Sequence, residues 1–347
     1  ECYLLDYRTN RIHNMFRISI FDIDVNGRRR ITKNSVKRSI KQCINPFGTI
    51  VRFQRFNKFR MDYMNTSKKV YCNSNDINLE DTDIIYLGSD QIWNPDITEG
   101  FDNVYFGKLG VNKIFSFSYA ASLGRTNFSK EEKTELKRML KNVNKISVRE
   151  EEGAEIIREL THKPIVCVPD PTVLVDRTHW EKLAKPIKLN HRKYILVYML
   201  IFSQDVVDLA QKVSKLFNCE IILLDSGSKK RIKGMKKKKH YGPREFLSYI
   251  ANAEYVITNS FHGTVFSVIF NKQFFTIPHP TKGSRMINFC RKLNLENRLV
   301  YGSKATLLDE VHNSIDYNTV MDRLEELKKV GLDFIKETLE ETSREQI

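Results

Sequence analysis

The sequence lacks the markers of several protein classes. It has no apolar run of about 18 residues, which a membrane-spanning helix needs, and its first residues show no signal-peptide pattern. Its six cysteines form no CxxC pair and no metal-binding spacing. Walker, HExxH and GxSxG motifs are absent as well. We therefore expect a cytoplasmic chain, soluble or peripheral at the inner face of the membrane, with reduced cysteines and no metal or cofactor.

Positive charge is abundant and unevenly placed. The formal net charge is +15, and residues 1–70 hold 16 Lys and Arg against 5 Asp and Glu. Such a segment suits nucleic acid, an anionic membrane surface or anionic glycans. Nucleic acid is the least favoured partner, because no zinc-finger, RNP-like or helix-turn-helix signature is present. A second basic run, "SKKRIKGMKKKKH" at 228–240, predicts a mobile surface loop, whose functional interpretation is attraction to anionic lipid head groups.

The length and the element pattern predict two domains. A chain of 347 residues exceeds what one core usually supports, and short apolar runs alternate with amphipathic stretches from "DIIYLGSD" onward. This alternation is typical of parallel sheets covered by helices on both faces. We expect a Rossmann-like domain over 1–185 with a basic, acceptor-side insertion at about 14–80, a Rossmann-like donor-binding domain over 186–316, and a C-terminal helix over 317–347.

Polar residues follow the predicted strands, where ligands bind in open parallel sheets. After "YVIT", the turn "NSFHG" holds Asn259, Ser260, His262 and Gly263 at a predicted helix start. Free backbone N–H groups and the helix dipole favour an anion such as phosphate there, and a histidine can bind it or move a proton. The alternative is that Asn259 or Ser260 only caps the helix while His262 packs between domains.

Two further strand ends carry candidate residues. "GSDQIWN" places Ser89, Asp90 and Trp93 after "IIYL", where a carboxylate and an aromatic face suit a sugar. Arg149 and Glu150 follow "KISV" and suit an anion clamp beside a base. The ordinary alternatives are a capping Asp90, a packed Trp93 and an inter-domain ion pair.

A third basic group stands in "HPTKGSRMINF". Lys282 and Arg285 lie at a predicted helix start, where their charges suit phosphate or carboxylate, although exposed cations are often only solvated.

Taken together, several motifs resemble the polysaccharide pyruvyl transferase family. They are "YLGSDQIWN", "FSYAASLG", "ISVREEEGAEII", "VPDPTVLVDRTHW", "GPREFLSYIANAEYVITNSFHGTVFSVIFNKQFFTI" and "KGSRMINF", in order from about residue 80 to 300. The resemblance implies an α/β fold of two Rossmann-like domains facing a cleft, as in glycosyltransferase-B enzymes. It also implies transfer of pyruvate from phosphoenolpyruvate to a sugar of a cell-surface glycan or its lipid-linked precursor.

The resemblance also implies roles and departures. His262 is expected to be the acid or the phosphate partner, and Asp90 or Glu150 the base for a sugar hydroxyl. Arg149, Lys282, Arg285 and the helix amides are expected to bind the donor. Many relatives carry Arg where this chain has Ser260, and an N-terminal "NYGA"-like element is expected before "ECYLLDY", so we expect that an element is missing at the start.

Two other interpretations stay open at this stage. A nucleotide-sugar-dependent glycosyltransferase would have the same two-domain fold, and preference for CMP or UDP over phosphoenolpyruvate would favour it. A basic scaffold or nucleic-acid binder would instead show salt-dependent binding to DNA or RNA without phosphate release.

Overall fold

The structure, a computed structural model, divides into two compact units. It describes residues 1–9, 22–23, 28–33, 35–36, 46–79, 82–110, 114–187, 193–225, 232–279, 283–302 and 313–345. Unit 1 comprises Glu1–Val168 and Phe334–Ile347, and unit 2 comprises Pro169–Asp333. Within the described ranges, no helix combines the length and the apolar character that crossing a bilayer requires.

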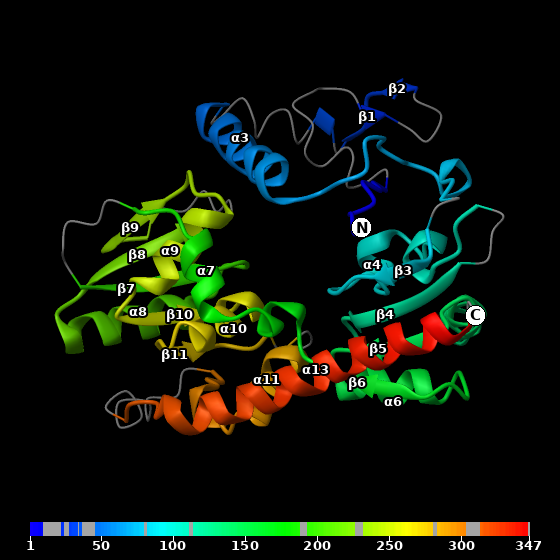
Figure 1. The fold of residues 1–347 in the computed structure, drawn as a ribbon. Coiled ribbons are helices and arrows are strands. Elements are labelled where there is room, and N and C mark those ends of the chain that lie inside the picture. Colours follow the sequence, from blue (N-terminus) through cyan, green and yellow to red (C-terminus); the bar gives the residue numbers. More distant parts are fainter. Residues whose placement is uncertain are drawn as a thin grey trace. The chain divides into compact units, whose positions relative to one another are not determined.

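Unit 1 is built on a parallel sheet of order β3-β4-β5-β6 (Figure 1). The alternation of apolar strands and amphipathic helices predicts this arrangement, and side chains such as Val148, Leu136 and Ile157 form its buried core. A capping box between Ser129 and Glu132 opens α5. The elements are β3 (Ile84–Leu87), α4 (Pro95–Thr98), β4 (Phe115–Ala121), α5 (Lys130–Leu140), β5 (Lys145–Val148), α6 (Glu151–Arg158) and β6 (Ile165–Cys167).

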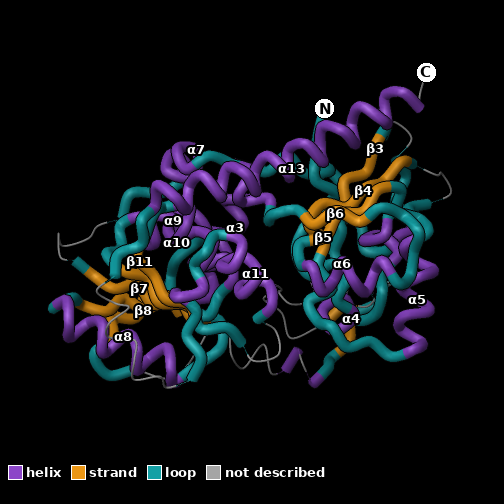
Figure 2. Tube along the Cα trace, turned by 90° about the horizontal axis from the view of Figure 1, so that it is seen from below, coloured by secondary structure: helices purple, strands orange, loops and turns teal. Residues whose placement is uncertain are grey.

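Unit 2 contains a second parallel sheet, of order β11-β10-β7-β8-β9 (Figure 1), whose strands are drawn in orange in Figure 2. Side chains alternate along each strand, so Ile195 and Val197 pack with α8, whereas Leu196 packs in the cluster formed with α9, α10 and α11. The strands are β7 (Tyr194–Met199), β8 (Glu220–Asp225), β9 (Met235–Lys238), β10 (Tyr255–Thr258) and β11 (Gln273–Thr276). The helices are α7 (Arg177–Leu183), α8 (Gln204–Phe217), α9 (Pro243–Ala251), α10 (Phe261–Ile269), α11 (Ser284–Lys292) and α13 (Tyr317–Glu345).

The two sheets confirm the predicted α/β class with two Rossmann-like sheets. The division between units differs from the predicted boundary after residue 185, because residues 169–185 pack with unit 2. Trp180 of α7 meets the Phe266 ring edge-on at 5.1 Å, and Arg244 Nε donates to the Leu183 carbonyl at 2.8 Å. The predicted C-terminal helix exists as α13, whose residues belong to unit 2 through Asp333 and to unit 1 from Phe334.

The basic N-terminal segment contains more regular structure than the sequence pattern predicts. An antiparallel pair, β1 (Asp22–Ile23) with β2 (Arg29–Arg30), precedes α3 (Pro46–Tyr63), an 18-residue helix within the predicted insertion. Asp6 accepts hydrogen bonds from Arg8 and, at 2.8 Å, from Arg60 of α3. Long-range ion pairs, invisible to local periodicity, therefore hold the start of the chain to this helix.

The second lysine-rich run corrects a prediction. Residues 228–231 lie outside the described ranges, but Met235–Lys238 form the edge strand β9, paired in parallel with β8. Lys236 and Lys238 are exposed, while Met235 packs against the core. Lysine is well suited to an edge strand, because its charge opposes pairing with another chain. The predicted mobile loop is therefore, over these residues, part of the sheet.

Candidate functional site

Each unit carries one cluster of polar side chains at the carboxyl edge of its sheet. In unit 1, Asp90 comes after β3, Ser122 after β4, and Arg149 with Glu150 after β5. Arg149 Nη2 lies 3.0 Å from Asp90 Oδ1, and its Nε lies 3.6 Å from Glu150 Oε1. Ser122 Oγ donates to Glu150 Oε1 at 2.7 Å. The structure thus brings the three predicted charged residues together.

Burial separates the roles of the three charges. The Arg149 and Glu150 side chains are only 3% and 5% exposed, whereas the Asp90 side chain is 57% exposed. A buried guanidinium between two carboxylates is an ion pair that orients both, rather than an open anion clamp. Arg149 is ion-paired within unit 1, so the pair differs from the inter-domain one that was the alternative. Asp90 is the carboxylate of this cluster that is exposed to solvent.

The backbone conformation of Asp90 is also unusual. Its φ of 74° lies in the left-handed region, which is uncommon outside glycine. Ser122 N donates to the Asp90 carbonyl at 2.9 Å, so the strained turn is tied to the end of the neighbouring strand. Strain of this kind gathers at functional sites when the surroundings hold it in place.

The other two predicted residues of this region behave differently. Ser89 Oγ is shielded from solvent and has no hydrogen-bond partner among the described residues. Trp93 is 0% exposed, stacks on Phe106 at 5.1 Å and donates its Nε1–H to the Tyr105 carbonyl at 2.8 Å. The prediction of Trp93 as a sugar platform is therefore wrong, because both of its ring faces are enclosed in the core. The packed alternative is the observed one.

In unit 2, the predicted turn joins β10 to α10. Ser260 is the N-cap residue and its Oγ accepts a hydrogen bond from the Gly263 amide at 3.3 Å. Thr258 Oγ1 accepts from the Ser260 amide at 3.0 Å and donates to the Tyr198 carbonyl at 2.7 Å. A Cβ at Gly263 would lie 2.4 Å from Thr258 Oγ1, so only glycine fits there. Ser260 and Gly263 thus shape the helix start on which His262 stands.

His262 faces a carboxylate that the sequence reasoning missed. Its Nε2 lies 3.7 Å from Asp170 Oδ2, and its side chain is 39% exposed while that of Asp170 is 2% exposed. The Thr172 amide and hydroxyl donate to Asp170 Oδ1 at 3.1 and 2.6 Å, which leaves Oδ2 toward the histidine. Asp170 belongs to the motif "VPDPTVLVDRTHW" and follows β6, and its position after a strand was the available signal.

The remaining predicted residues surround this turn. Asn259 Oδ1 accepts from the Leu200 amide at 2.9 Å and its Nδ2 donates to the Ile201 carbonyl at 2.7 Å, so its side chain holds the loop after β7. The Arg285 guanidinium lies 5.6 Å from the centre of the Phe261 ring, whose edge in turn packs at 5.3 Å on His262. Arg285 therefore belongs to the neighbourhood of the helix start. Lys282 lies outside the described residues.

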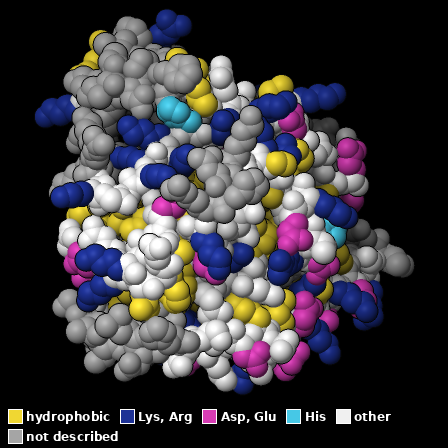
Figure 3. All heavy atoms as spheres, turned by 90° about the vertical axis from the view of Figure 1, so that its left-hand side faces the viewer, with side chains coloured by type: hydrophobic (Ala, Val, Ile, Leu, Met, Phe, Trp, Pro, Cys, Tyr) yellow, Lys and Arg dark blue, Asp and Glu magenta, His cyan; other side chains and the backbone are white. Residues whose placement is uncertain are grey.

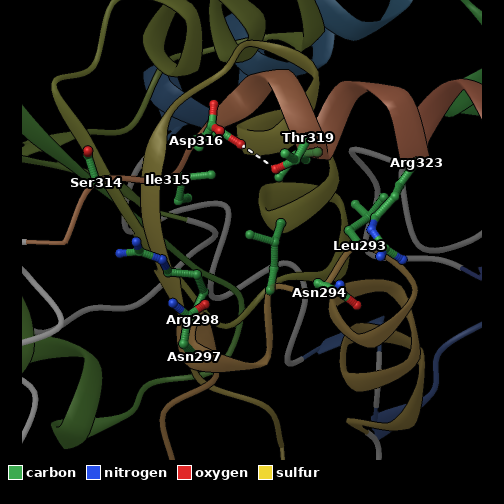
Figure 4. A pocket seen from close by; sticks show the side chains of 11 residues that line it. Leu293, Asn294, Asn297, Arg298, Ser314, Ile315, Asp316, Thr319 and Arg323 are labelled. Carbon is green, nitrogen blue, oxygen red and sulfur yellow. Dashed lines mark hydrogen bonds between the residues drawn. The ribbon is translucent and has the colours of Figure 1, made fainter.

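A cavity of about 360 Å³ lies elsewhere in unit 2 (Figure 4). It is bordered by Arg298, which donates to Tyr255 Oη at 3.3 Å, and by Ile315, whose amide donates to Gln273 Oε1 at 2.8 Å. Tyr255 and Gln273 begin β10 and β11, so the cavity is at the amino edge of the sheet. None of the predicted site residues that the structure describes lines it. Among the described residues, no three His, Cys, Asp or Glu side chains are grouped as metal ligands.

The family follows from comparison with known proteins. The family model described as polysaccharide pyruvyl transferase matches residues 5–280, which includes both polar clusters. The chain therefore belongs to the polysaccharide pyruvyl transferase family, a family of transferases. This confirms the resemblance of the motifs. No curated protein matches the sequence significantly.

Solved structures with a similar chain trace are distant in sequence. UDP-N-acetylglucosamine 2-epimerase from Rickettsia bellii is 13% identical, with 99% of this chain and 90% of that chain covered and a TM-score of 0.47. UDP-GlcNAc 2-epimerase from Methanocaldococcus jannaschii, in complex with UDP-GlcNAc and UDP, is 14% identical over 74% and 75%, with a TM-score of 0.43. The glycosyltransferase SnogD from Streptomyces nogalater is 13% identical over 74% of each chain, with a TM-score of 0.34.

Proposed function

We propose that the protein transfers pyruvate from phosphoenolpyruvate to two hydroxyl groups of one sugar, forming a ketal and releasing phosphate. The acceptor is a sugar of a cell-surface glycan or of its lipid-linked precursor. The observation that carries this proposal is the family match over residues 5–280, with His262 at a helix start beside buried Asp170. Phosphoenolpyruvate serves as a substrate, and the scheme needs no resident cofactor.

The donor is assigned to the turn of unit 2. Phosphate and carboxylate groups bind well at a helix N-terminus, where backbone N–H groups and the helix dipole favour negative charge. The first turn of α10 begins with Phe261 and His262, and Arg285 is placed against the same Phe261 ring. A guanidinium is suited to the planar carboxylate or the phosphate of the donor. These groups are assigned the anion binding for which the resemblance implies an arginine at the position of Ser260.

His262 is the proposed acid of the reaction. In the first step a proton is added to the methylene carbon of phosphoenolpyruvate, which leaves C2 as an oxocarbenium ion that a sugar hydroxyl attacks. Phosphate then departs with its bonding electron pair, and a second hydroxyl attacks C2 to close the ring. The two hydroxyls release two protons, of which one replaces the proton given to carbon and the other goes to phosphate. A histidine can perform these transfers near neutral pH.

The carboxylates of unit 1 are assigned to the acceptor hydroxyl. Asp90 is the proposed base because it is the exposed carboxylate, whereas Glu150 is enclosed and accepts from Ser122. Arg149 is assigned to holding both carboxylates rather than to binding the donor directly. A base of this kind contributes by removing the hydroxyl proton as the new C–O bond forms.

The test is a product assay. The protein is incubated with phosphoenolpyruvate and a panel of free and lipid-linked hexosides, and both phosphate release and the mass of the acceptor are followed. We expect release of phosphate with a pyruvyl mass gain that is lost in His262→Ala and retained in His179→Ala, an exposed histidine of α7 in the same unit. Transfer from a nucleotide sugar, with no product from phosphoenolpyruvate, would replace the proposal with a glycosyltransferase. An unchanged rate in His262→Ala would refute the assigned acid.

A further inference from the structure

The loop after β7 exposes three consecutive apolar side chains. Leu200, Ile201 and Phe202 are 50%, 61% and 41% exposed. Burial of apolar surface is the main favourable contribution to folding. Apolar side chains that stay exposed to water therefore do not stabilise the fold. Uninterrupted exposed apolar runs of three or more residues are errors in a design unless they serve a function. The run therefore marks a candidate interaction surface.

The structure holds this run in a defined conformation. Both ends of the Asn259 amide bind its backbone, at the Leu200 amide and the Ile201 carbonyl, at 2.9 and 2.7 Å. On its far side, Ser203 caps α8 by accepting a hydrogen bond from the Val206 amide at 3.4 Å. The exposed side chains are thus presented by a pinned turn between a buried strand and a capped helix.

Exposed lysines lie at the end of β9, at the same carboxyl edge of the sheet as the loop after β7. The register places Tyr198 beside Leu224 and Leu224 beside Lys238, so the chain after β7 and the chain after β9 emerge at one level. Neighbouring strands are about 4.8 Å apart, which puts β7 and β9 roughly 10 Å from each other. Lys238 and Lys239 are exposed there. The face drawn in Figure 3 shows many Lys and Arg side chains, with apolar side chains and Asp and Glu side chains among them.

We propose that this edge of unit 2, formed by Leu200–Phe202 with Lys238 and Lys239, docks onto an anionic membrane surface. The apolar turn enters the boundary between head groups and acyl chains, and the two lysines lie against lipid phosphates. Stable peripheral binding requires both apolar insertion and electrostatic attraction, because either one alone gives only marginal, reversible attachment. Positive side chains near an anionic leaflet each add to the affinity, and salt screens their contribution.

The proposal goes beyond the proposed reaction and does not depend on it. It places the membrane-facing edge next to the donor turn, since Asn259 belongs to that turn and also holds the apolar loop. If the reaction uses a lipid-linked acceptor, this edge delivers the protein to the surface where such an acceptor resides. Vesicle binding is measured without phosphoenolpyruvate or sugar, so a failure of docking and a failure of pyruvyl transfer are separate results.

The experiment is cosedimentation with vesicles of phosphatidylcholine alone or mixed with phosphatidylglycerol. We expect the protein to bind the anionic vesicles at low salt and to bind the neutral ones far more weakly. Ile201→Ser with Phe202→Ser, and separately Lys238→Glu with Lys239→Glu, should each reduce the partition coefficient on anionic vesicles about tenfold or more. Circular dichroism shows whether each variant keeps its fold.

Matched controls change the same residue types elsewhere. Lys137→Glu with Lys141→Glu makes the same change of net charge at exposed positions of unit 1. Val330→Ser with Leu339→Ser removes two side chains of α13 that are 43% and 46% exposed. Both control variants should bind vesicles within about twofold of the unaltered protein. Equal loss in the control and test variants, or no binding to anionic vesicles at all, would overturn the proposal. Binding only to detergent-solubilised lipid-linked sugar would assign the edge to the acceptor's lipid instead.

Discussion

The buried carboxylate of Asp170 lies 3.7 Å from the imidazole Nε2 of His262, across a separation of more than ninety positions in the sequence. Asp170 is positioned by two hydrogen bonds from Thr172, and His262 by the first turn of α10. A buried carboxylate in this position orients the imidazole ring. It is the feature of unit 2 most closely tied to the proposed acid.

Replacing Asp170 should therefore impair the reaction more than it impairs the fold. We expect Asp170→Asn to lower kcat roughly tenfold to a hundredfold, because the variant keeps the shape but loses the charge beside the acid. Thr172→Val removes one hydrogen bond to Asp170 and should produce a smaller loss. Equal rates for Asp170→Asn and the unaltered protein at every pH would contradict this role.

Trp93 should prove to be a packing residue. We expect Trp93→Ala to lower the free energy of unfolding by about 3–5 kcal/mol, because it empties a buried site against Phe106. Trp93→Phe keeps an aromatic ring and loses the hydrogen bond to the Tyr105 carbonyl. Loss of that bond should lower the free energy of unfolding by roughly 1 kcal/mol. The decisive measurement is the KM for the sugar acceptor in Trp93→Phe, which should equal that of the unaltered protein. A markedly raised KM would restore a binding role.

Two helical glycines should respond oppositely to alanine. At Gly263 a Cβ would meet Thr258 Oγ1 at 2.4 Å, and that hydroxyl is held by its bonds to Tyr198 and Ser260. We expect Gly263→Ala to destabilise unit 2 by roughly 1–3 kcal/mol. At Gly153 the nearest atoms are 3.8 and 3.9 Å away, so Gly153→Ala should stabilise α6 by up to about 1 kcal/mol. Thermal unfolding midpoints compare the two, and a stable Gly263→Ala variant would show that the turn can rearrange.

Acid should loosen the start of the chain through Asp6. Its hydrogen bond from Arg8 holds the pKa of Asp6 below its usual value against the opposing effect of burial, and the charges of Arg8 and Arg60 act in the same direction as the hydrogen bond. Because the folded pKa is lowered, the stabilisation is fully present above the unfolded pKa and is lost as pH falls through the folded one. Hydrogen exchange of residues 2–8 should therefore accelerate below about pH 4.

An Asp6→Asn variant distinguishes loss of this ion pair from acid unfolding of the whole protein. Asp6→Asn should exchange quickly over residues 2–8 already at neutral pH and show little further change on acidification. Asp62→Asn, at an exposed i,i+4 pair with Lys58, should behave like the unaltered protein, since such pairs contribute little. If Asp6→Asn retained the protection of the unaltered protein, the ion pairs with Arg8 and Arg60 would not be what holds the segment.

Local patterns predicted much of the fold because they act over a few residues. The alternation of apolar strands and amphipathic helices predicted the parallel sheets that both units contain, although it missed the edge strand β9. Residues 235–238 were assigned to a loop because three consecutive lysines are not typical of a strand. They form one only because they pair with β8. The division of the units at Val168 depends on how α7 packs, which periodicity does not encode.

The candidate site shows the same division between local and long-range information. The sequence by itself determined that polar residues follow the strands of parallel sheets and that the family motifs stand in order, but it left open whether Ser260 or Asn259 caps a helix. Only the tertiary structure decided that Arg149 is enclosed by Asp90 and Glu150, that Asp170 faces His262, and that Trp93 is buried. The physical reason is that charge pairing and burial depend on contacts between residues distant in the chain, such as Asp90 and Arg149, which are 59 positions apart.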